Sequence, residues 1–187
     1  SFHLLGRTPL MEVTEAWLDH DDATLESEKM ALRERMIEAS SSGKVTMVEW
    51  NRAWQKFTRS RDVYLTIEAV EASGNHAAYH AVDVTDMSAL EALGKSLGRP
   101  ITGVVHGAGM EDSKLVSDKG YDVFDKVVRV KVDGWRALLS AVVASGATVP
   151  KFACCFTSVA GRFGNGGQTD YAAANSVLDA EMARLTA

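Results

Sequence analysis

The sequence has only two cysteines, no excess of basic residues and no long apolar run. Its formal net charge is −5 and its pI is near 5.5. No basic run with interleaved aromatic residues occurs, which argues against a nucleic-acid partner. The apolar runs are far shorter than the ~20 residues that cross a bilayer, and the first residues carry no signal-peptide pattern. With 46% hydrophobic and 24% charged residues, the composition indicates a globular protein that binds neither nucleic acid nor a membrane.

The two cysteines, Cys154 and Cys155, are adjacent in an apolar run. Neighbours in a strand point to opposite faces, so these thiols are poorly placed to bond with each other. No histidine or cysteine has metal-ligand spacing with them, and no metal site is predicted. We therefore expect reduced, buried, structural thiols and a cytoplasmic location.

The first part of the chain is predicted to be mostly helical. Residues 2–5 are predicted to form a strand that ends at Gly6 and Arg7. Because the sequence begins inside this strand, we expect further residues before residue 1. Residues 11–73 have helical spacing in three stretches, the second from about residue 47 and the third over about 62–72. Trp50, Trp54 and Phe57 fall on one face and predict core packing. No catalytic set is visible in this segment.

From residue 77 onward the pattern alternates between short apolar strands and helices. Such alternation is typical of crossover units in a parallel sheet. We expect one α/β domain over residues 1–187, with residues 11–73 as a helical insertion. The predicted strands are 77–82, 101–106 and 151–156, and the predicted helices are 88–97, 121–145 and about 171–185.

Polar and glycine residues follow each predicted strand, and in open parallel sheets ligands bind beyond these carboxyl ends. Turn formation alone explains the glycines but not the whole set. Arg7 has two readings, because an arginine here is either a surface side chain after a turn or a ligand for the 2′-phosphate of NADP. The set comprises Gly6 and Arg7, then Asp83, then His106 to Gly109, then Ser158.

A second group of residues suits carbonyl chemistry. Tyr171 and Asn175 are four residues apart, on one face of a predicted helix, and Ser158 precedes them across a glycine-rich loop. A phenol can donate a proton to a developing alkoxide, and a hydroxyl can hold a carbonyl oxygen. The phenol needs a nearby cation to act as a useful acid.

Lys131 is a candidate for that cation. In the helix 121–145, it fills the gap in the apolar stripe between Val128 and Trp135. A lysine on an inward stripe is costly unless it is paired or functional. The alternative is a lysine whose amine reaches out to solvent from the edge of the stripe.

Five motifs together resemble one family, the ketoreductase domains of type I polyketide synthases. These domains belong to the short-chain dehydrogenase/reductase superfamily, and the resemblance runs from Ala77 to the C-terminus with the first strand in addition. The helical insertion resembles that of polyunsaturated-fatty-acid synthases. Ordinary members of the superfamily read Tyr-x-x-x-Lys, whereas here Asn175 takes the lysine position and Lys131 lies on the preceding helix. The motifs are Val105–Gly109, Lys131–Gly134, Ser158–Gly161, Gly166–Gln168 and Tyr171–Asn175.

The resemblance implies a Rossmann-like, doubly wound fold and a role for each residue. Tyr171 would donate the proton to the β-keto oxygen and Ser158 would orient that oxygen. Lys131 would make Tyr171 a stronger acid and touch the nicotinamide ribose, while Asn175 would support Lys131 or a proton-relay water. The markers of product handedness, at Phe163 and at 111–113, fit neither subclass.

The resemblance also implies NADPH as cofactor and a β-ketoacyl thioester on an acyl carrier protein as substrate, within a multienzyme whose other domains are partners. Gly6 and Arg7 would bind the cofactor, with Arg7 on the 2′-phosphate, and Asp83 and Val84 would contact the adenine. The residues that would line the cofactor are His106, Gly107, Ala108 and Gly109.

The sequence lacks a Gly-x-Gly-x-x-Gly loop, its preceding strand and the C-terminal elements of such a fold. In the doubly wound order that strand is central, so the strands ending at Leu5 and His106 are expected to have no common neighbour. We therefore expect a piece of a larger polypeptide that is inactive by itself. Two alternatives are a catalytically silent scaffold domain and a free-standing short-chain dehydrogenase. The complete catalytic set disfavours the scaffold, and the Lys131/Asn175 arrangement disfavours the free-standing enzyme.

Overall fold

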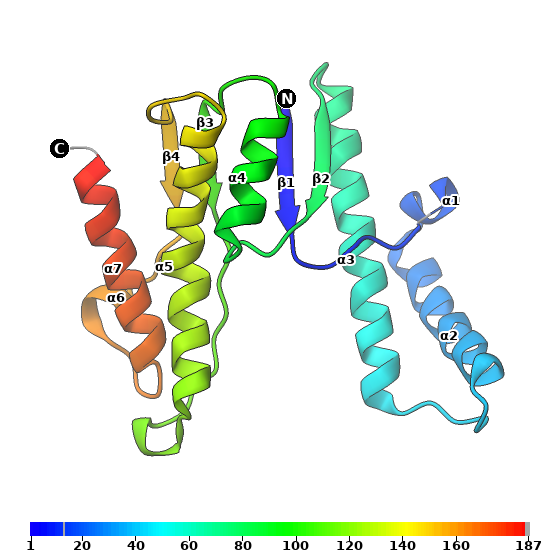
Figure 1. Ribbon diagram of the computed structural model, residues 1–187. Helices are drawn as coiled ribbons and strands as arrows, with labels where there is room; N and C mark the ends of the chain where they lie inside the picture. Colours follow the sequence, from blue (N-terminus) through cyan, green and yellow to red (C-terminus); the bar gives the residue numbers. More distant parts are fainter. Residues whose placement is uncertain (13, 186–187) are drawn as a thin grey trace. The chain divides into compact units, whose positions relative to one another are not determined.

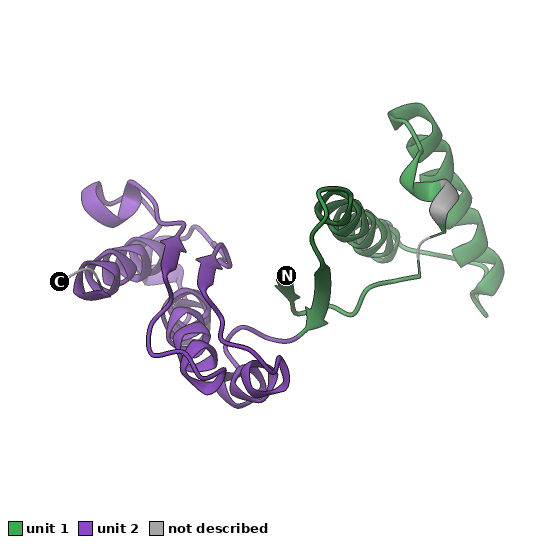
Figure 2. Ribbon diagram, turned by 90° about the horizontal axis from the view of Figure 1, so that it is seen from above, with its two compact units in different colours: residues 1–81 green, residues 82–187 purple. Residues whose placement is uncertain are grey.

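The computed structural model describes residues 1–12 and 14–185, so the predictions that touch Val13, Thr186 and Ala187 lie outside the described part. The chain divides into two compact units, residues 1–81 and residues 82–187 (Figure 2). Each unit combines a pair of parallel strands with helices, which confirms the predicted α/β class.

The first unit is built on two parallel strands, β1 (Phe2–Gly6) and β2 (Ala77–Ala81). Their register runs from Phe2 opposite Ala77 to Gly6 opposite Ala81. Parallel strands need a long crossover, and here it holds the helices α1 (Glu15–Leu18), α2 (Asp22–Ala39) and α3 (Met47–Ala72) (Figure 1). The helical segment predicted after the first strand is therefore present.

Helix α3 is continuous, whereas two separate helices were predicted over this stretch. It begins with a capping box, in which Glu49 N–H donates to the Thr46 hydroxyl and Thr46 N–H donates to the Glu49 carboxylate. Such a box satisfies backbone donors at the first turn. No glycine or proline occurs between residues 47 and 72, so nothing interrupts the helix before Ser73 and Gly74.

The core of the first unit is aromatic, as the spacing predicted. Phe57 is buried, stacks on Trp54 with centroids 5.0 Å apart, and meets the edge of Trp17 at the same distance. Trp50 is buried as well. Met30 of α2, by contrast, is 44% exposed, so it does not extend this core.

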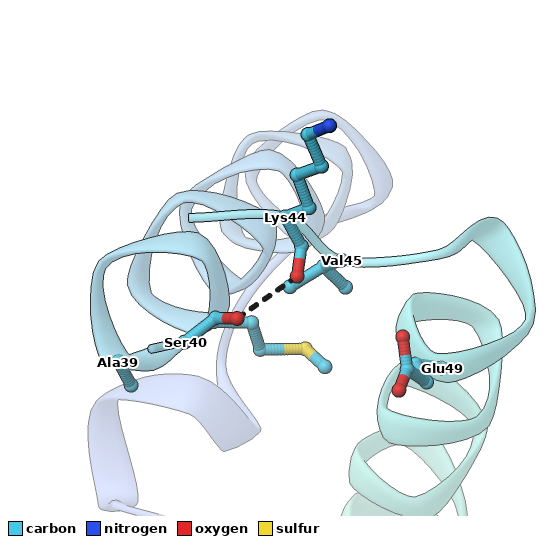
Figure 3. A pocket seen from close by; sticks show the side chains of 6 residues that line it. Ala39, Ser40, Lys44, Val45 and Glu49 are labelled. Carbon is cyan, nitrogen blue, oxygen red and sulfur yellow. Dashed lines mark hydrogen bonds between the residues drawn. The ribbon is translucent and has the colours of Figure 1, made fainter. Parts of the chain in front are cut away.

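An open hollow of about 310 Å³ lies where α2 turns into α3 (Figure 3). The Ser40 hydroxyl donates to the Lys44 carbonyl across the turn, at 3.0 Å. Glu49 faces the hollow from α3, but its carboxylate already accepts from Thr46. The lining contains no polar cluster suited to chemistry; its residues are Met36, Ala39, Ser40, Lys44, Val45 and Glu49.

The second unit is built on the parallel strands β3 (Gly103–His106) and β4 (Phe152–Cys155). Its main helices are α4 (Met87–Ser96), α5 (Tyr121–Ala144) and α7 (Thr169–Leu185). These five elements lie within a few residues of their predicted bounds. A short 3₁₀ turn, η1 (Val116–Asp118), and the single-turn helix α6 (Ala160–Phe163) were not predicted.

Helix α5 covers one face of β3 and organises the core of this unit (Figure 1). Val104 of β3, Trp135 and Val142 of α5, and Leu178 of α7 form one buried cluster. Val105, which points to the other face of the strand, is exposed. Gly94 of α4 lies against the Ala141 carbonyl of α5 so closely that a β-carbon there would collide with it.

Among the described residues the strands form two separate sheets, with β1 paired to β2 and β3 paired to β4. This is the pattern expected when the central strand of a doubly wound sheet is not part of the sequence. Within the described ranges, the strands that end at Gly6 and His106 accordingly share no neighbour.

Candidate active site

Lys131 is the centre of the candidate site in the second unit. It is 4% exposed, on the inward face of α5, and its ammonium group donates to the Phe156 carbonyl at 2.8 Å, just after β4. The same nitrogen lies 5.7 Å from the centroid of the Tyr171 ring, within the range of a cation–π contact. Burial lowers the pKa of Lys131, and the neighbouring Cys155 opposes that shift. The lysine is thus paired inward rather than extended to solvent.

His106, at the end of β3, supports the turn of α5 that carries Lys131. Its ring is 1% exposed, and Nε2 lies 2.9 Å from the backbone oxygen of Lys131. An N–H at Nε2 donates to that carbonyl. Burial lowers the pKa of His106, the bond to the Lys131 carbonyl opposes this, and the positive charge of Lys131 adds to the lowering. The imidazole is therefore neutral near neutral pH.

The glycine turn after β3 passes directly over Lys131. A β-carbon on Gly109 would stand 3.0 Å from Cε and 3.4 Å from Nζ of Lys131. Gly107 and Gly109 are exposed and Ala108 is half-buried. The turn therefore packs closely on the lysine side chain, and a glycine at position 109 is what allows this approach.

Tyr171 and Asn175 occupy the first turns of α7, as predicted. Asn175 is fully buried and its amide donates to the Tyr171 backbone carbonyl at 2.7 Å. Its Oδ1 is buried with no hydrogen-bond partner among the described residues. That oxygen can accept from an ammonium group or a water molecule, which is the role expected of it. Tyr171 itself is half-buried.

Ser158 follows β4 and is half-buried. Its hydroxyl oxygen accepts the Ala160 N–H at 3.2 Å, at the start of α6. The glycine-rich loop that follows contains Gly167 at φ +76°, a conformation that favours glycine over any other residue. The sequence thus places the serine hydroxyl and the Tyr171 helix at two ends of one short loop.

Two residues that sequence reasoning missed hold the start of the Tyr171 helix. Lys119, just after η1, forms a buried ion pair with Asp170, with Nζ and Oδ1 2.5 Å apart. The same Oδ1 accepts the Tyr171 N–H at 2.8 Å. An acidic residue in the first turn of a helix was a local signal for Asp170. Lys119 lies 51 positions earlier, and no sequence pattern links it to Asp170.

The same loop is held at further points. Lys114 N–H donates to the Gly167 carbonyl at 3.0 Å, and the Gln168 amide donates to Glu111. Glu111 also accepts from Ser113. The segment 111–119 is therefore fastened to the loop that leads into Tyr171.

Asp83 and Val84 lie at the exit of the second predicted strand. The Asp83 carboxylate accepts both the N–H of Thr85, at 2.9 Å, and its hydroxyl, at 2.8 Å. Val84 packs next to Gly134 of α5, where a β-carbon would stand 3.0 Å from the valine Cγ1. Asp83 thus shapes the turn, and the adenine contact stays a prediction.

Gly6 and Arg7 belong to the first unit, whereas the other predicted site residues belong to residues 82–187. Gly6 lies against the Tyr79 ring, and a β-carbon there would meet the phenol oxygen. That oxygen donates to the Thr8 carbonyl at 2.7 Å, so the turn carrying Arg7 is anchored to β2. The Arg7 side chain is exposed.

Cys154 and Cys155 are unbonded and half-buried, less buried than expected. Burial raises the pKa of Cys155 to about 11, with a further increase from Cys154, while Lys131 works in the opposite direction. In the described part of the chain, no group of three or more histidine, cysteine, aspartate or glutamate side chains is arranged to hold a metal ion. No helix in that part is long and apolar enough to cross a membrane.

Parallel β–α units, a buried lysine beside a tyrosine at a helix start and an asparagine one turn later give the second unit a Rossmann-like fold of the short-chain dehydrogenase type. A family model described as KR domain matches residues 33–187. The chain belongs to this family, the ketoreductase domains of polyketide synthases, whose members are oxidoreductases.

Known proteins similar to the chain include both synthases and solved ketoreductases. A polyunsaturated fatty acid synthase of Thraustochytrium sp. is 30% identical in one of its subunits over 182 residues, which cover 94% of this chain and 6% of that protein. Erythronolide synthase EryA2 of Saccharopolyspora erythraea is 38% identical over 111 residues, or 59% of this chain and 3% of that protein. The ketoreductase from the first module of phoslactomycin biosynthesis in Streptomyces sp. HK803 superposes with a TM-score of 0.59 at 31% identity, covering 65% of this chain and 29% of its own. The chain thus spans a small part of each.

Proposed function

We propose that the chain carries the proton-donating side of an NADPH-dependent β-ketoacyl reductase. It acts on a β-ketoacyl thioester held by an acyl carrier protein, inside a multienzyme of the polyketide or polyunsaturated-fatty-acid type. The two unbonded cysteines suit a reducing, cytoplasmic setting. The observation that carries the proposal is the placement of the buried Lys131 ammonium group beside the Tyr171 ring.

The proposed acid is the Tyr171 phenol. Burying an ammonium group is unfavourable without compensation, and Lys131 has one neutral carbonyl, that of Phe156, as a hydrogen-bond acceptor. Negative charge that develops on the Tyr171 oxygen during proton transfer would be stabilised by this cation. The proposed role of Lys131 is thus electrostatic, and it acts on the charge that appears on the Tyr171 oxygen as the proton moves to the substrate.

The substrate carbonyl needs a second contact. The Ser158 hydroxyl can rotate and donate to the carbonyl oxygen while its own oxygen continues to accept from Ala160. By analogy with oxyanion holes, a donor aimed at the developing alkoxide stabilises the transition state by about 3–4 kcal/mol. Ser158 and Tyr171 together would hold the oxygen that receives the proton.

The residues fit a nicotinamide cofactor. The turn Gly107–Gly109 has exposed glycines and packs against Lys131 so closely that a side chain on Gly109 would press on the lysine Cε. An ammonium group has three donors, so Lys131 can bind ribose hydroxyls in addition to Phe156. Arg7 would bind the 2′-phosphate, and Asp83 and Val84 the adenine side. When bound, the cofactor supplies a hydride to the carbonyl carbon.

The test uses the full-length protein and a β-ketoacyl thioester of pantetheine, with NADPH consumption as the readout. Tyr171→Phe removes only the phenol oxygen, and we expect kcat to fall by about 10²–10⁴-fold. Tyr121, which is 78% exposed in the same unit, provides the matched control, and Tyr121→Phe should keep wild-type kcat.

Two other results would redirect the assignment. Equal background rates in the wild type and in Tyr171→Phe would favour the silent scaffold. Efficient oxidation of small alcohols, with no preference for the thioester, would favour a free-standing dehydrogenase. Reduction of the thioester on the carrier protein faster than on free pantetheine is the result expected of a multienzyme domain.

A further inference from the structure

The ion pair between Lys119 and Asp170 is almost completely removed from solvent. The two side chains are 3% and 1% exposed. Lys119 donates to Asp170 and, at 3.2 Å, to the Gly167 carbonyl. Asp170 Oδ1 also accepts the Tyr171 N–H, while its Oδ2 is buried with no hydrogen-bond partner among the described residues. One pair of charges therefore joins the η1 segment, the glycine-rich loop and the first turn of α7.

Net stabilisation is a poor explanation for such a pair. Two buried charges lose their hydration, and their attraction often does no more than offset that loss. The incomplete satisfaction of Asp170 makes the arrangement still less favourable. What the pair does supply is geometry, because Lys119 holds Asp170 in place and Asp170 in turn binds the N–H of Tyr171, the residue that carries the phenol.

We propose that Lys119 and Asp170 are positioning residues for Tyr171. The inference rests on the proposed role of Tyr171 as proton donor. Asp170 fixes the backbone of Tyr171 by accepting the Tyr171 N–H. Lys119 fixes Asp170 through the ion pair and fixes the loop by donating to the Gly167 carbonyl. Lys131, the cation beside the Tyr171 ring, is itself held by two residues at the strand ends. Its backbone carbonyl contacts the His106 ring, and its ammonium group donates to the Phe156 carbonyl. The pair thus sets the start of α7 relative to Lys131.

Loss of the pair should affect the chemical step more than binding. Misplacement of a reacting group by about 1 Å can reduce a rate about a hundredfold. Neither Lys119 nor Asp170 is expected to touch the cofactor, so its affinity should change little. This split between rate and binding distinguishes positioning from general loosening of the fold.

The test compares Lys119→Met and Asp170→Asn in the full-length protein. We expect kcat with the pantetheine thioester to fall about 10- to 100-fold, with the NADPH dissociation constant within about twofold of wild type. The double variant Lys119→Met/Asp170→Asn leaves no unpaired charge and serves where a single variant folds poorly. In a Tyr171→Phe background, Lys119→Met should cause no further loss, because the two act through one group.

Arg136→Met is the matched control. Arg136 of α5 pairs with Glu181 of α7 at 2.7 Å, so this pair too reaches α7, but at the surface and away from Tyr171. The Arg136→Met variant should leave kcat unchanged. An equal loss in Arg136→Met, an unchanged kcat in Lys119→Met, or a loss that adds to that of Tyr171→Phe overturns the proposal.

A second readout separates this inference from the proposed function. A 3-fluorotyrosine label at position 171 gives a fluorine resonance that reports the ring's surroundings without any turnover. The resonance should shift or broaden in Lys119→Met and not in Arg136→Met. An inactive wild type would refute the reductase assignment, whereas an unchanged resonance in Lys119→Met would refute the positioning role.

Discussion

The ammonium nitrogen of Lys131 lies 5.7 Å from the centroid of the Tyr171 ring and 2.8 Å from the Phe156 carbonyl. The lysine comes from the middle of α5 and the tyrosine from the start of α7. Their encounter depends on the packing of these two helices, which share the cluster of Trp135 and Leu178. The buried cation and the phenol are thus held by the core of the unit itself.

Replacing Lys131 by methionine should lower kcat without lowering the free energy of unfolding. Without the cation, we expect kcat to fall by about 10²-fold or more. The unfolding free energy near neutral pH should be equal to or greater than that of the wild type, because the pKa of Lys131 is lowered by burial. A lysine whose pKa is lower in the folded state disfavours folding below that pKa, and this cost disappears as pH rises toward the ordinary value.

Denaturant unfolding at several pH values checks this directly. The stability advantage of Lys131→Met should shrink as the solution becomes alkaline. Lys126→Met, on the exposed side of the same helix, should change neither kcat nor the pH dependence. A variant that is both fully active and less stable at neutral pH would contradict the assignment of Lys131.

Arg7 should determine the choice between NADPH and NADH. A charge-assisted hydrogen bond to a phosphate contributes about 1.5–3 kcal/mol, so Arg7→Ala should raise the KM for NADPH by about 10- to 150-fold. The KM for NADH, which lacks that phosphate, should change little. Steady-state kinetics with both cofactors give the answer, and a parallel rise in both values would show that Arg7 has a structural role in its turn.

Much of the second unit could be predicted from the sequence, because strand and helix periods there are clear and each strand exit has turn residues. The apolar stripe between Val128 and Trp135 predicted that Lys131 lies at the inward face, but it left open an amine that reaches out to solvent, and the contact with the Phe156 carbonyl decides between the two. The Lys119–Asp170 pair could not be predicted, since its partners are far apart in sequence and meet only through tertiary packing. The continuity of α3 was missed because its two apolar stretches were treated as separate helices, although no glycine or proline interrupts it.

Cys155 should react slowly with alkylating reagents. Its pKa is raised from 9.0 to about 11, so at about pH 8 it carries about a hundredfold less thiolate than an ordinary cysteine. The thiolate is the species that attacks iodoacetamide. Mass spectrometry of the labelled protein should show Cys155 modified far more slowly than a free cysteine standard. In Lys131→Met the labelling should become slower still, because the cation that favours the thiolate is gone; faster labelling would contradict the pKa shift.

Gly94→Ala should weaken the packing of α4 on α5. A β-carbon at this position would meet the Ala141 carbonyl, which is backbone and cannot rotate away. Overpacking of this kind costs about 1–3 kcal/mol, although alanine itself favours a helix over glycine by up to about 1 kcal/mol. The expected net change is therefore a loss of about 1–2 kcal/mol in unfolding free energy, measured by denaturant titration.

Gly166→Ala is the control for this prediction. A β-carbon at that position meets no atom within 4 Å, so the variant should leave the free energy of unfolding almost unchanged. A Gly94→Ala protein as stable as the wild type would mean that α4 can shift away from α5 at no cost, and the close approach of these two helices would then not be required by the fold.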